Sequence, residues 1–335
     1  IGPLLALPRT GATAFEMIFS KDISNYNTYK IIFIIIFFGV SLLFSLKSSK
    51  VVDRVGAILT PILLIVLALI IFKGVFFPIG ESISLTKELP PFKYGFLNGY
   101  QTMDTLAAIV FSDIILKSIR KDKNLSEKQE FSFLIQTSII AIGGLAIVYG
   151  GLGFIGSTVT NILPSGTGSV DLLTSIVKLL LGNFGKIILA ICVTGACITT
   201  AIGLTATVAD YFSDLTKISY EKLAIITTII SIIFAMFGVD IIIKLAVPVL
   251  VFLYPIAIAL IFLNILKNKI KNDNIFLGTV IGAGIISSFE ALQAIGLKLS
   301  FLDSLFSNLP FDSLGLAWVC PAILTGIIFK FIPKK

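Results

Sequence analysis

The sequence YGFLNGYQTMDTLAAIVFSDIIL, from Tyr94 to Leu116, has the length of a membrane-spanning helix but not its usual composition. Its middle part, Asn98–Met103, combines polar side chains with glycine, and Asp104 follows directly. The hydrocarbon core of a bilayer offers no hydrogen-bond partners, so a continuous lipid-facing helix does not tolerate such a stretch. We therefore predict that the backbone departs from helical geometry within Asn98–Met103.

The composition of the whole chain predicts an integral membrane protein. Of 335 residues, 56% are hydrophobic and 13% charged, and the mean hydropathy is +1.02. Soluble domains carry about a quarter charged residues. The same values exclude disorder, a coiled coil and a nucleic-acid partner, and they make the lipid bilayer the expected surroundings. The net charge of +7 is interpreted first as membrane topology.

Residue counts argue against an enzyme and against a bound metal or haem. The chain contains no histidine, and its three cysteines lie in apolar runs without CxxC spacing. Buried free thiols are the simpler interpretation of these cysteines. No P-loop, nucleophile elbow or HExxH motif is present. The sequence predicts no enzyme and no cofactor.

Hydropathy predicts an all-α polytopic protein in which residues 1–335 form a single transmembrane domain. The expected spans are Tyr29–Leu46, Val55–Phe77, Tyr94–Leu116, Phe131–Ile155, Ile187–Ala209, Leu223–Val239, Leu245–Leu266, Asn274–Ile295 and Ser313–Phe331. The shorter apolar segment Gly168–Leu181 is interpreted as a re-entrant or interfacial helix. Lysine and arginine concentrate in alternate short loops, which predicts a cytoplasmic C-terminus. Ile1–Phe19, with Pro3 and Pro8, resembles the end of an interrupted helix, and we expect the chain to be a fragment.

The polar middle of Tyr94–Leu116 is the first candidate binding site. An interrupted helix exposes backbone carbonyls and a half-helix N-terminus to a ligand. Asp104 lies deep in the span, where a charge costs roughly 2.5–3.5 kcal/mol on insertion scales. Either it caps the free amides of the second half-helix, or its charge contacts a ligand. The candidate residues are Asn98, Gly99, Tyr100, Gln101, Thr102 and Asp104.

Two further groups carry chemistry in the apolar chain. Thr199 and Thr200, halfway along Ile187–Ala209, offer adjacent hydroxyls that suit a hard monovalent cation, or they bond back to the preceding turn. Arg9 and Glu16 share one helix face about 10 Å apart along the axis. A bend at Pro8 would let them form a salt bridge, which is the default interpretation, and a gating role is the alternative.

The motifs together resemble one family, the branched-chain amino acid:cation symporters of the BrnQ type. The matching stretches, in family order, are Gly2–Thr10 running on to Ala14–Glu16, Asn98–Leu106, Thr199–Thr205, Ile218–Tyr220, Pro248–Leu250 with Tyr254-Pro255, and Gly315–Trp318. The resemblance implies a LeuT-like inverted-repeat helix bundle, of which the first two helices and part of the third are missing. It also implies that Tyr94–Leu116 is a broken helix that opens the second repeat.

The function implied by this resemblance is uptake of leucine, isoleucine and valine with Na⁺ or H⁺ across the cell membrane by alternating access. The substrate would meet Asn98–Asp104, the cation would meet Thr199 and Thr200, and Arg9 with Glu16 would be structural or gating. The coupling cation is the only other small partner, and no cofactor is implied. Another LeuT-like permease, such as one for aromatic amino acids, and a non-transporting channel or scaffold are the alternatives.

Overall fold

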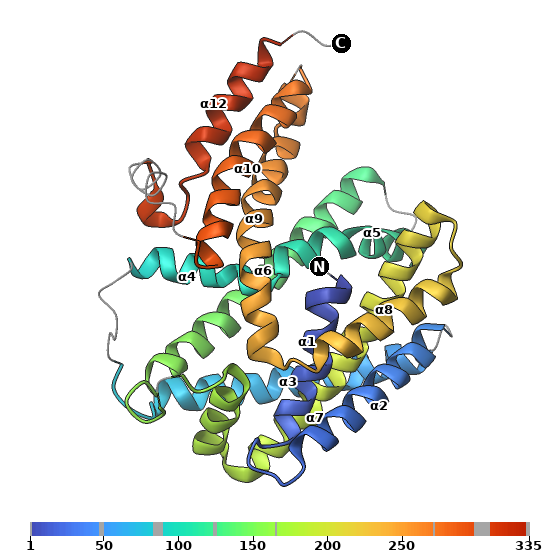
Figure 1. Ribbon diagram of the computed structural model, residues 1–335, viewed down its shortest axis with the longest axis vertical. Coiled ribbons are helices and arrows are strands. Elements are labelled where there is room, and N and C mark those ends of the chain that lie inside the picture. The colour runs from blue at the N-terminus through green and yellow to red at the C-terminus, as the bar shows by residue number, and fades with distance from the viewer. Residues whose placement is uncertain are drawn as a thin grey trace. The chain divides into compact units, whose positions relative to one another are not determined.

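The computed structural model describes residues 2–46, 50–82, 90–122, 126–164, 166–270, 272–297 and 309–332, and all regular structure within these ranges is helical (Figure 1). The α-helices are α1 (Leu7–Ile18), α2 (Tyr26–Leu46), α3 (Lys50–Phe76), α4 (Pro91–Gly99), α5 (Asp104–Asp122), α6 (Glu127–Ser157), α7 (Ser169–Thr216), α8 (Tyr220–Ala235), α9 (Val239–Ile265), α10 (Asn274–Ala294) and α12 (Val319–Lys330). The π-helix η1 (Gly2–Ala6) leads into α1, and the short 3₁₀ turns are η2 (Tyr100–Thr102), η3 (Lys267–Lys269) and η4 (Asp312–Leu314).

Six helices in the described part of the chain are long and apolar enough to cross a membrane. Their outward faces expose large aliphatic side chains, among them Ile36, Ile65 and Ile140. Such surfaces are unfavourable in water and match the hydrocarbon of a bilayer. The chain is therefore a polytopic all-α membrane protein.

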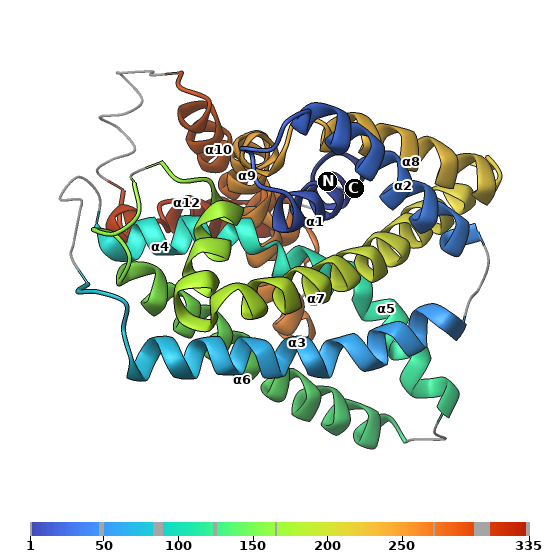
Figure 2. The ribbon, with the colours of Figure 1, turned by 90° about the horizontal axis from the view of Figure 1, so that it is seen from below.

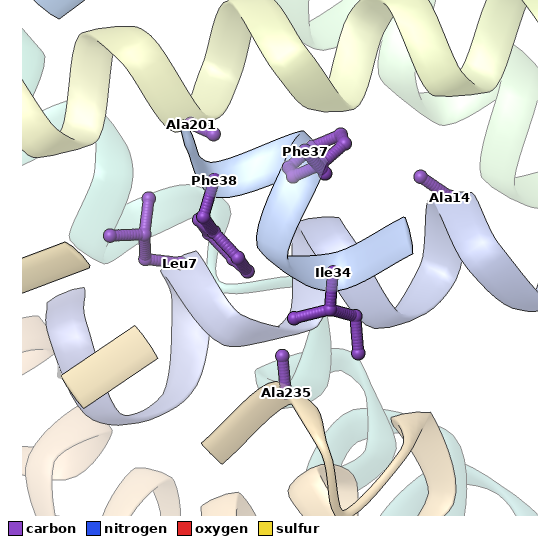
Figure 3. Packing of buried hydrophobic residues seen from close by; sticks show 7 residues of the cluster. All are labelled: Leu7, Ala14, Ile34, Phe37, Phe38, Ala201 and Ala235. Atoms are coloured by element: carbon purple, nitrogen blue, oxygen red, sulfur yellow. The ribbon is translucent and has the colours of Figure 1, made fainter. Parts of the chain in front are cut away.

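The chain divides into two compact units. The first comprises Ile1–Leu85 and Ser126–Ile242, and the second comprises Thr86–Leu125 and Ile243–Lys335. In the first unit α1 is the central helix, because α7, α8 and α2 pack around it. Figure 3 shows one of its apolar clusters, which joins these four helices through Leu7, Ala14, Ile34, Phe37, Phe38, Ala201 and Ala235. Helix α3 lies along α7 and α6 (Figure 2).

A kink divides α7 into two helical segments. Gly182 has φ 71° and ψ −168°, which separates residues 169–181 from residues 183–216. The positive φ favours glycine at this position. The kink frees carbonyl groups, and the Lys73 ammonium of α3 donates a hydrogen bond to one of them, the Leu180 carbonyl. A helical segment at the expected Gly168–Leu181 is thus confirmed, and its re-entrant or interfacial position stays a prediction.

Two expected span boundaries are wrong because the chain turns at a glycine. Helix α8 ends at Ala235, Gly238 takes φ 84°, and α9 already begins at Val239, where the sequence predicts the end of a span. Likewise, Ser313–Phe331 is not one helix, because Gly315 at φ 74° separates η4 from α12. A single glycine within an apolar run gives too weak a signal to locate such a turn.

In the second unit, α10 and α12 pack closely side by side (Figure 1). A Cβ added to Gly278 would lie 2.5 Å from the Thr325 carbonyl oxygen, and one added to Gly282 would lie 2.5 Å from the Pro321 carbonyl oxygen. The small residues therefore allow this close packing of backbones. In α6 of the first unit, only Gly151 makes a comparable approach, to Ile71, and the flanking glycines of that helix face open space within the described residues.

Candidate functional site

The helix expected at Tyr94–Leu116 is broken in the middle. Helix α4 ends at Gly99, one 3₁₀ turn follows, and α5 begins at Asp104. Between them Met103 takes φ 60° and ψ 12°, the left-handed region, which costs roughly 1–2 kcal/mol for an L-residue other than glycine. The predicted departure from helical geometry within Asn98–Met103 is confirmed. A strained residue of this kind persists only when the surrounding structure holds it, and such residues cluster at functional sites.

The candidate side chains around the break do not all face one way. Asn98 and Thr102 are exposed and bond to the local backbone: the Asn98 amide donates to the Tyr94 carbonyl at 2.8 Å, and the Thr102 hydroxyl donates to the Gly99 carbonyl at 2.9 Å. Gly99 is also exposed, and Gln101 is half-buried. What the break offers a ligand is therefore chiefly backbone, with these short polar side chains beside it.

Tyr100 is the buried anchor of the break. Its side chain is 4% exposed, and its ring stacks on Tyr254 of α9 with centroids 4.4 Å apart and planes at 17°. Phe96, one turn earlier in α4, contacts Tyr100 edge-on at 5.3 Å. The Tyr100 hydroxyl lies near the indole N–H of Trp318, although neither group makes a hydrogen bond to the described residues.

Tyr254 and Trp318 are absent from the predicted site. Both lie in stretches that carry the family resemblance, and only this position in the sequence could have indicated that they belong to the site. Tyr254 is buried at 4% exposure, and its hydroxyl also has no hydrogen-bond partner within the described residues. Buried polar groups of this kind are rare in native proteins, and each requires an explanation.

Asp104 occupies the first turn of α5 and is half-buried. A carboxylate at a helix N-terminus is favoured by the helix dipole and by the free amides of the first turn. Asp104 also lies near the Tyr254 hydroxyl of α9. Its place at the start of the second half-helix agrees with the sequence-based expectation.

The proposed cation ligands lie in the second segment of α7. The Thr199 hydroxyl donates to the Ala196 carbonyl at 3.0 Å, the back-bonding that was the simpler of the two interpretations. Thr200 is exposed. A hydroxyl that donates to a carbonyl keeps its oxygen lone pairs, so Thr199 can still coordinate a cation.

The expected Arg9–Glu16 salt bridge is not among the ion pairs of the described residues. Glu16, 8% exposed, instead accepts a hydrogen bond from the Val239 amide at 3.0 Å. Val239 is the first residue of α9, so Glu16 satisfies one of the free amides at the start of that helix. The titratable side chains near Arg9 include those of Cys197 and Tyr149. The sequence could not place Val239 next to Glu16.

Each of the two units contains an ion pair near the N-terminus of a helix. In the first unit Lys21 pairs with Asp171 at 2.9 Å, and Asp240 accepts a hydrogen bond from the Ser169 amide at 3.2 Å. The hydrogen bond to Asp171 raises the pKa of Lys21. In the second unit Lys93 of α4 pairs with Asp312 of η4 at 2.7 Å.

A polytopic bundle with a helix broken midway at a glycine-containing polar stretch defines a class, the membrane transporters. The chain belongs to the branched-chain amino acid transport protein family, whose family model matches residues 1–335. It is 38% identical to the branched-chain amino acid permease BraB of Bacillus subtilis (strain 168), over 98% of this chain and 75% of that protein. It is 35% identical to the permease BrnQ of the same organism, over 98% and 76%.

A relative from another genus shows the same likeness. The branched-chain amino acid transport system 2 carrier protein of Pseudomonas aeruginosa is 34% identical, over 98% of this chain and 76% of that protein. These relatives are named as permeases and carriers, and none of the three names describes an enzyme. The predicted family is confirmed, and a transporter of branched-chain amino acids is supported.

Proposed function

We propose that the protein is a secondary active symporter that takes up leucine, isoleucine and valine together with Na⁺ or H⁺. The break between α4 and α5 carries this proposal, because an interrupted helix presents free backbone groups at membrane depth. Membership of the family supports the choice of substrate class. The proposal also places the protein in the cell membrane with a cytoplasmic C-terminus and assigns it a LeuT-like pair of inverted repeats.

The two ends of the break suit the two charges of an amino acid. The carbonyl end of α4 carries partial negative charge and attracts an ammonium group, whereas the amide end of α5 attracts a carboxylate. These backbone groups are bordered by exposed Asn98, Gly99 and Thr102 and by half-buried Gln101 and Asp104. An apolar side chain gains only about 1–3 kcal/mol per methylene, so the three branched substrates should compete with modest preferences.

The coupling cation is assigned to the hydroxyls of Thr199 and Thr200, with backbone carbonyls completing its shell. The substrate is neutral overall, so one cation entering with it gains roughly 2.3 kcal/mol per 100 mV of membrane potential. Alternating access then converts this gain into accumulation of the amino acid. Glu16 is assigned a structural role because it satisfies the amide of Val239.

Uptake of radiolabelled leucine into proteoliposomes that contain the full-length protein tests the proposal. An inward Na⁺ gradient and an inward H⁺ gradient are imposed separately, each with an inside-negative potential. We expect saturable uptake that one gradient stimulates and that excess isoleucine or valine inhibits. Stronger inhibition by phenylalanine would favour an aromatic amino acid permease, and uptake that never saturates would favour a channel. Either result would overturn the proposed function.

A further inference from the structure

The break between α4 and α5 needs support from outside its own segment. Its 3₁₀ turn is three residues long, and the left-handed conformation of Met103 is unfavourable. Within the turn, the Met103 amide donates to the Tyr100 carbonyl at 3.2 Å, and the Thr102 hydroxyl donates to the Gly99 carbonyl at 2.9 Å, so both closures are local. A defined geometry at this point therefore depends on contacts from other helices.

Tyr254 supplies such a contact on the α4 side. Its ring stacks nearly parallel on Tyr100, the first residue of the 3₁₀ turn. Both rings are almost completely buried, and stacked aromatic pairs stabilise beyond the area that they bury. The position of Tyr100, and with it the end of α4, is therefore tied to α9.

The other end of the same side chain lies at the start of α5. The Tyr254 hydroxyl lies near the backbone amides of Thr105 and Leu106, the Thr105 side chain and Asp104, although it makes no hydrogen bond to the described residues. Catalytic hydrogen bonds in enzymes are often long or poorly aligned without ligand and tighten when it binds, and we infer the same behaviour for this hydroxyl. One side chain thus reaches both half-helices, with its ring on one and its hydroxyl beside the other.

We propose that Tyr254 is a positioning residue that fixes the two half-helices of the break relative to each other. In this way it sets the spacing between the carbonyl end and the amide end offered to the substrate. The proposal rests on the proposed function of the break as the substrate site. Tyr254, a residue of α9, thereby acts on the site through its contacts with Tyr100 and α5 and does not contact the substrate.

Two substitutions separate the ring from the hydroxyl. Tyr254→Phe keeps the stack on Tyr100 and removes the oxygen, and Tyr254→Leu removes both. We expect the Tyr254 hydroxyl to form a hydrogen bond to the start of α5 when substrate binds. Loss of this bond in Tyr254→Phe should raise the KM for leucine about 3- to 10-fold, with the maximal rate within about 2-fold of the parent. Tyr254→Leu should raise the KM further. Tyr211→Phe, which removes the same oxygen from an exposed ring of α7, is the matched control and should leave KM unchanged.

Initial rates of leucine uptake in proteoliposomes at matched protein content give KM and maximal rate separately. A purely structural role would lower the amount of folded protein, and hence the maximal rate, without moving KM. An unchanged KM in Tyr254→Phe would overturn the proposal, and this variant decides alone if Tyr254→Leu does not insert. Failure of the full-length parent protein to transport leucine would instead contradict the proposed function.

Discussion

Glu16 and Val239 lie 223 positions apart in the chain, and the carboxylate of Glu16 accepts a hydrogen bond from the Val239 amide at 3.0 Å. The contact joins the end of α1 to the beginning of α9 within the first unit. Gly238, at φ 84°, makes the turn that directs the Val239 amide to Glu16. A Cβ at Gly238 would lie 3.0 Å from the Glu16 oxygen, so the turn leaves little room for another residue.

The Glu16 contact gives the first prediction. Glu16→Ala leaves the Val239 amide buried without its partner, which costs about 1–3 kcal/mol of stability. Glu16→Gln keeps an accepting oxygen and should lose less than half as much. Thermal unfolding of the purified variants in detergent measures both. Equal destabilisation by Ala and Gln would show that the negative charge, rather than the hydrogen bond to Val239, stabilises this end of α1.

Close packing of α10 on α12 gives the second prediction. Gly282→Ala places a methyl group against Thr325 and the Pro321 carbonyl, and such overpacking typically costs about 1–3 kcal/mol. Gly284→Ala, on the same helix, meets only Ile256 at 3.8 Å and should be tolerated. The two melting temperatures are compared directly. Equal melting temperatures would mean that α10 and α12 are not in close contact at Gly282.

The paired hydroxyls of α7 give the third prediction. In the full-length protein, Thr199→Ala and Thr200→Ala each remove one proposed cation ligand, so the cation concentration for half-maximal leucine uptake should rise. Because cation and substrate binding are linked, leucine affinity at a fixed low cation concentration should fall as well. Thr207→Ala is the control, since the Thr207 hydroxyl bonds back to the Gly203 carbonyl on the same helix. If neither Thr199→Ala nor Thr200→Ala changes the cation dependence, these hydroxyls only pack.

Asp104 gives the fourth prediction. Asn is nearly as good a helix cap as Asp, whereas replacement of a cap by Ala typically costs ~1 kcal/mol. If Asp104 acts through its place at the start of α5, Asp104→Asn should transport nearly normally and Asp104→Ala should be less stable. We expect this outcome. Uptake by Asp104→Asn below about a tenth of the parent rate, at matched membrane expression, would show that the charge itself takes part in transport.

The sequence predicted those features that depend on local composition. The break at Asn98–Met103 could be predicted because a polar, glycine-containing stretch interrupts an apolar span. The short helix before Gly182 could be predicted because its apolar run is too short to cross a bilayer. The end of α8 and the beginning of α12 could not be predicted, since each depends on one glycine, Gly238 or Gly315, whose positive φ has no signature in the surrounding residues.

The contacts that position the candidate site lie beyond local sequence. Tyr254 stacks on Tyr100 across more than 150 positions of chain, and no periodicity in α9 distinguishes this tyrosine from an interfacial one. Glu16 is similar: spacing suggested Arg9 as its partner, whereas the fold brings the Val239 amide to it. Sequence reasoning identifies which residues can interact, and tertiary packing selects the partner.

The central claim is that the break between α4 and α5 binds the substrate, and protection of a single introduced thiol tests it most directly. Thr102→Cys places the thiol on the exposed side of the break, and Ser112→Cys places a matched one in α5, where Ser112 is also exposed and bonded three residues back. Each variant is reacted with a maleimide with and without saturating leucine. The labelling of the parent protein, which reports its own cysteines, is subtracted. We predict that leucine, isoleucine and valine slow labelling of Thr102→Cys at least about 3-fold, lysine does not, and Ser112→Cys is unaffected. Equal labelling of Thr102→Cys with and without leucine, in a variant that still transports leucine, would contradict the claim.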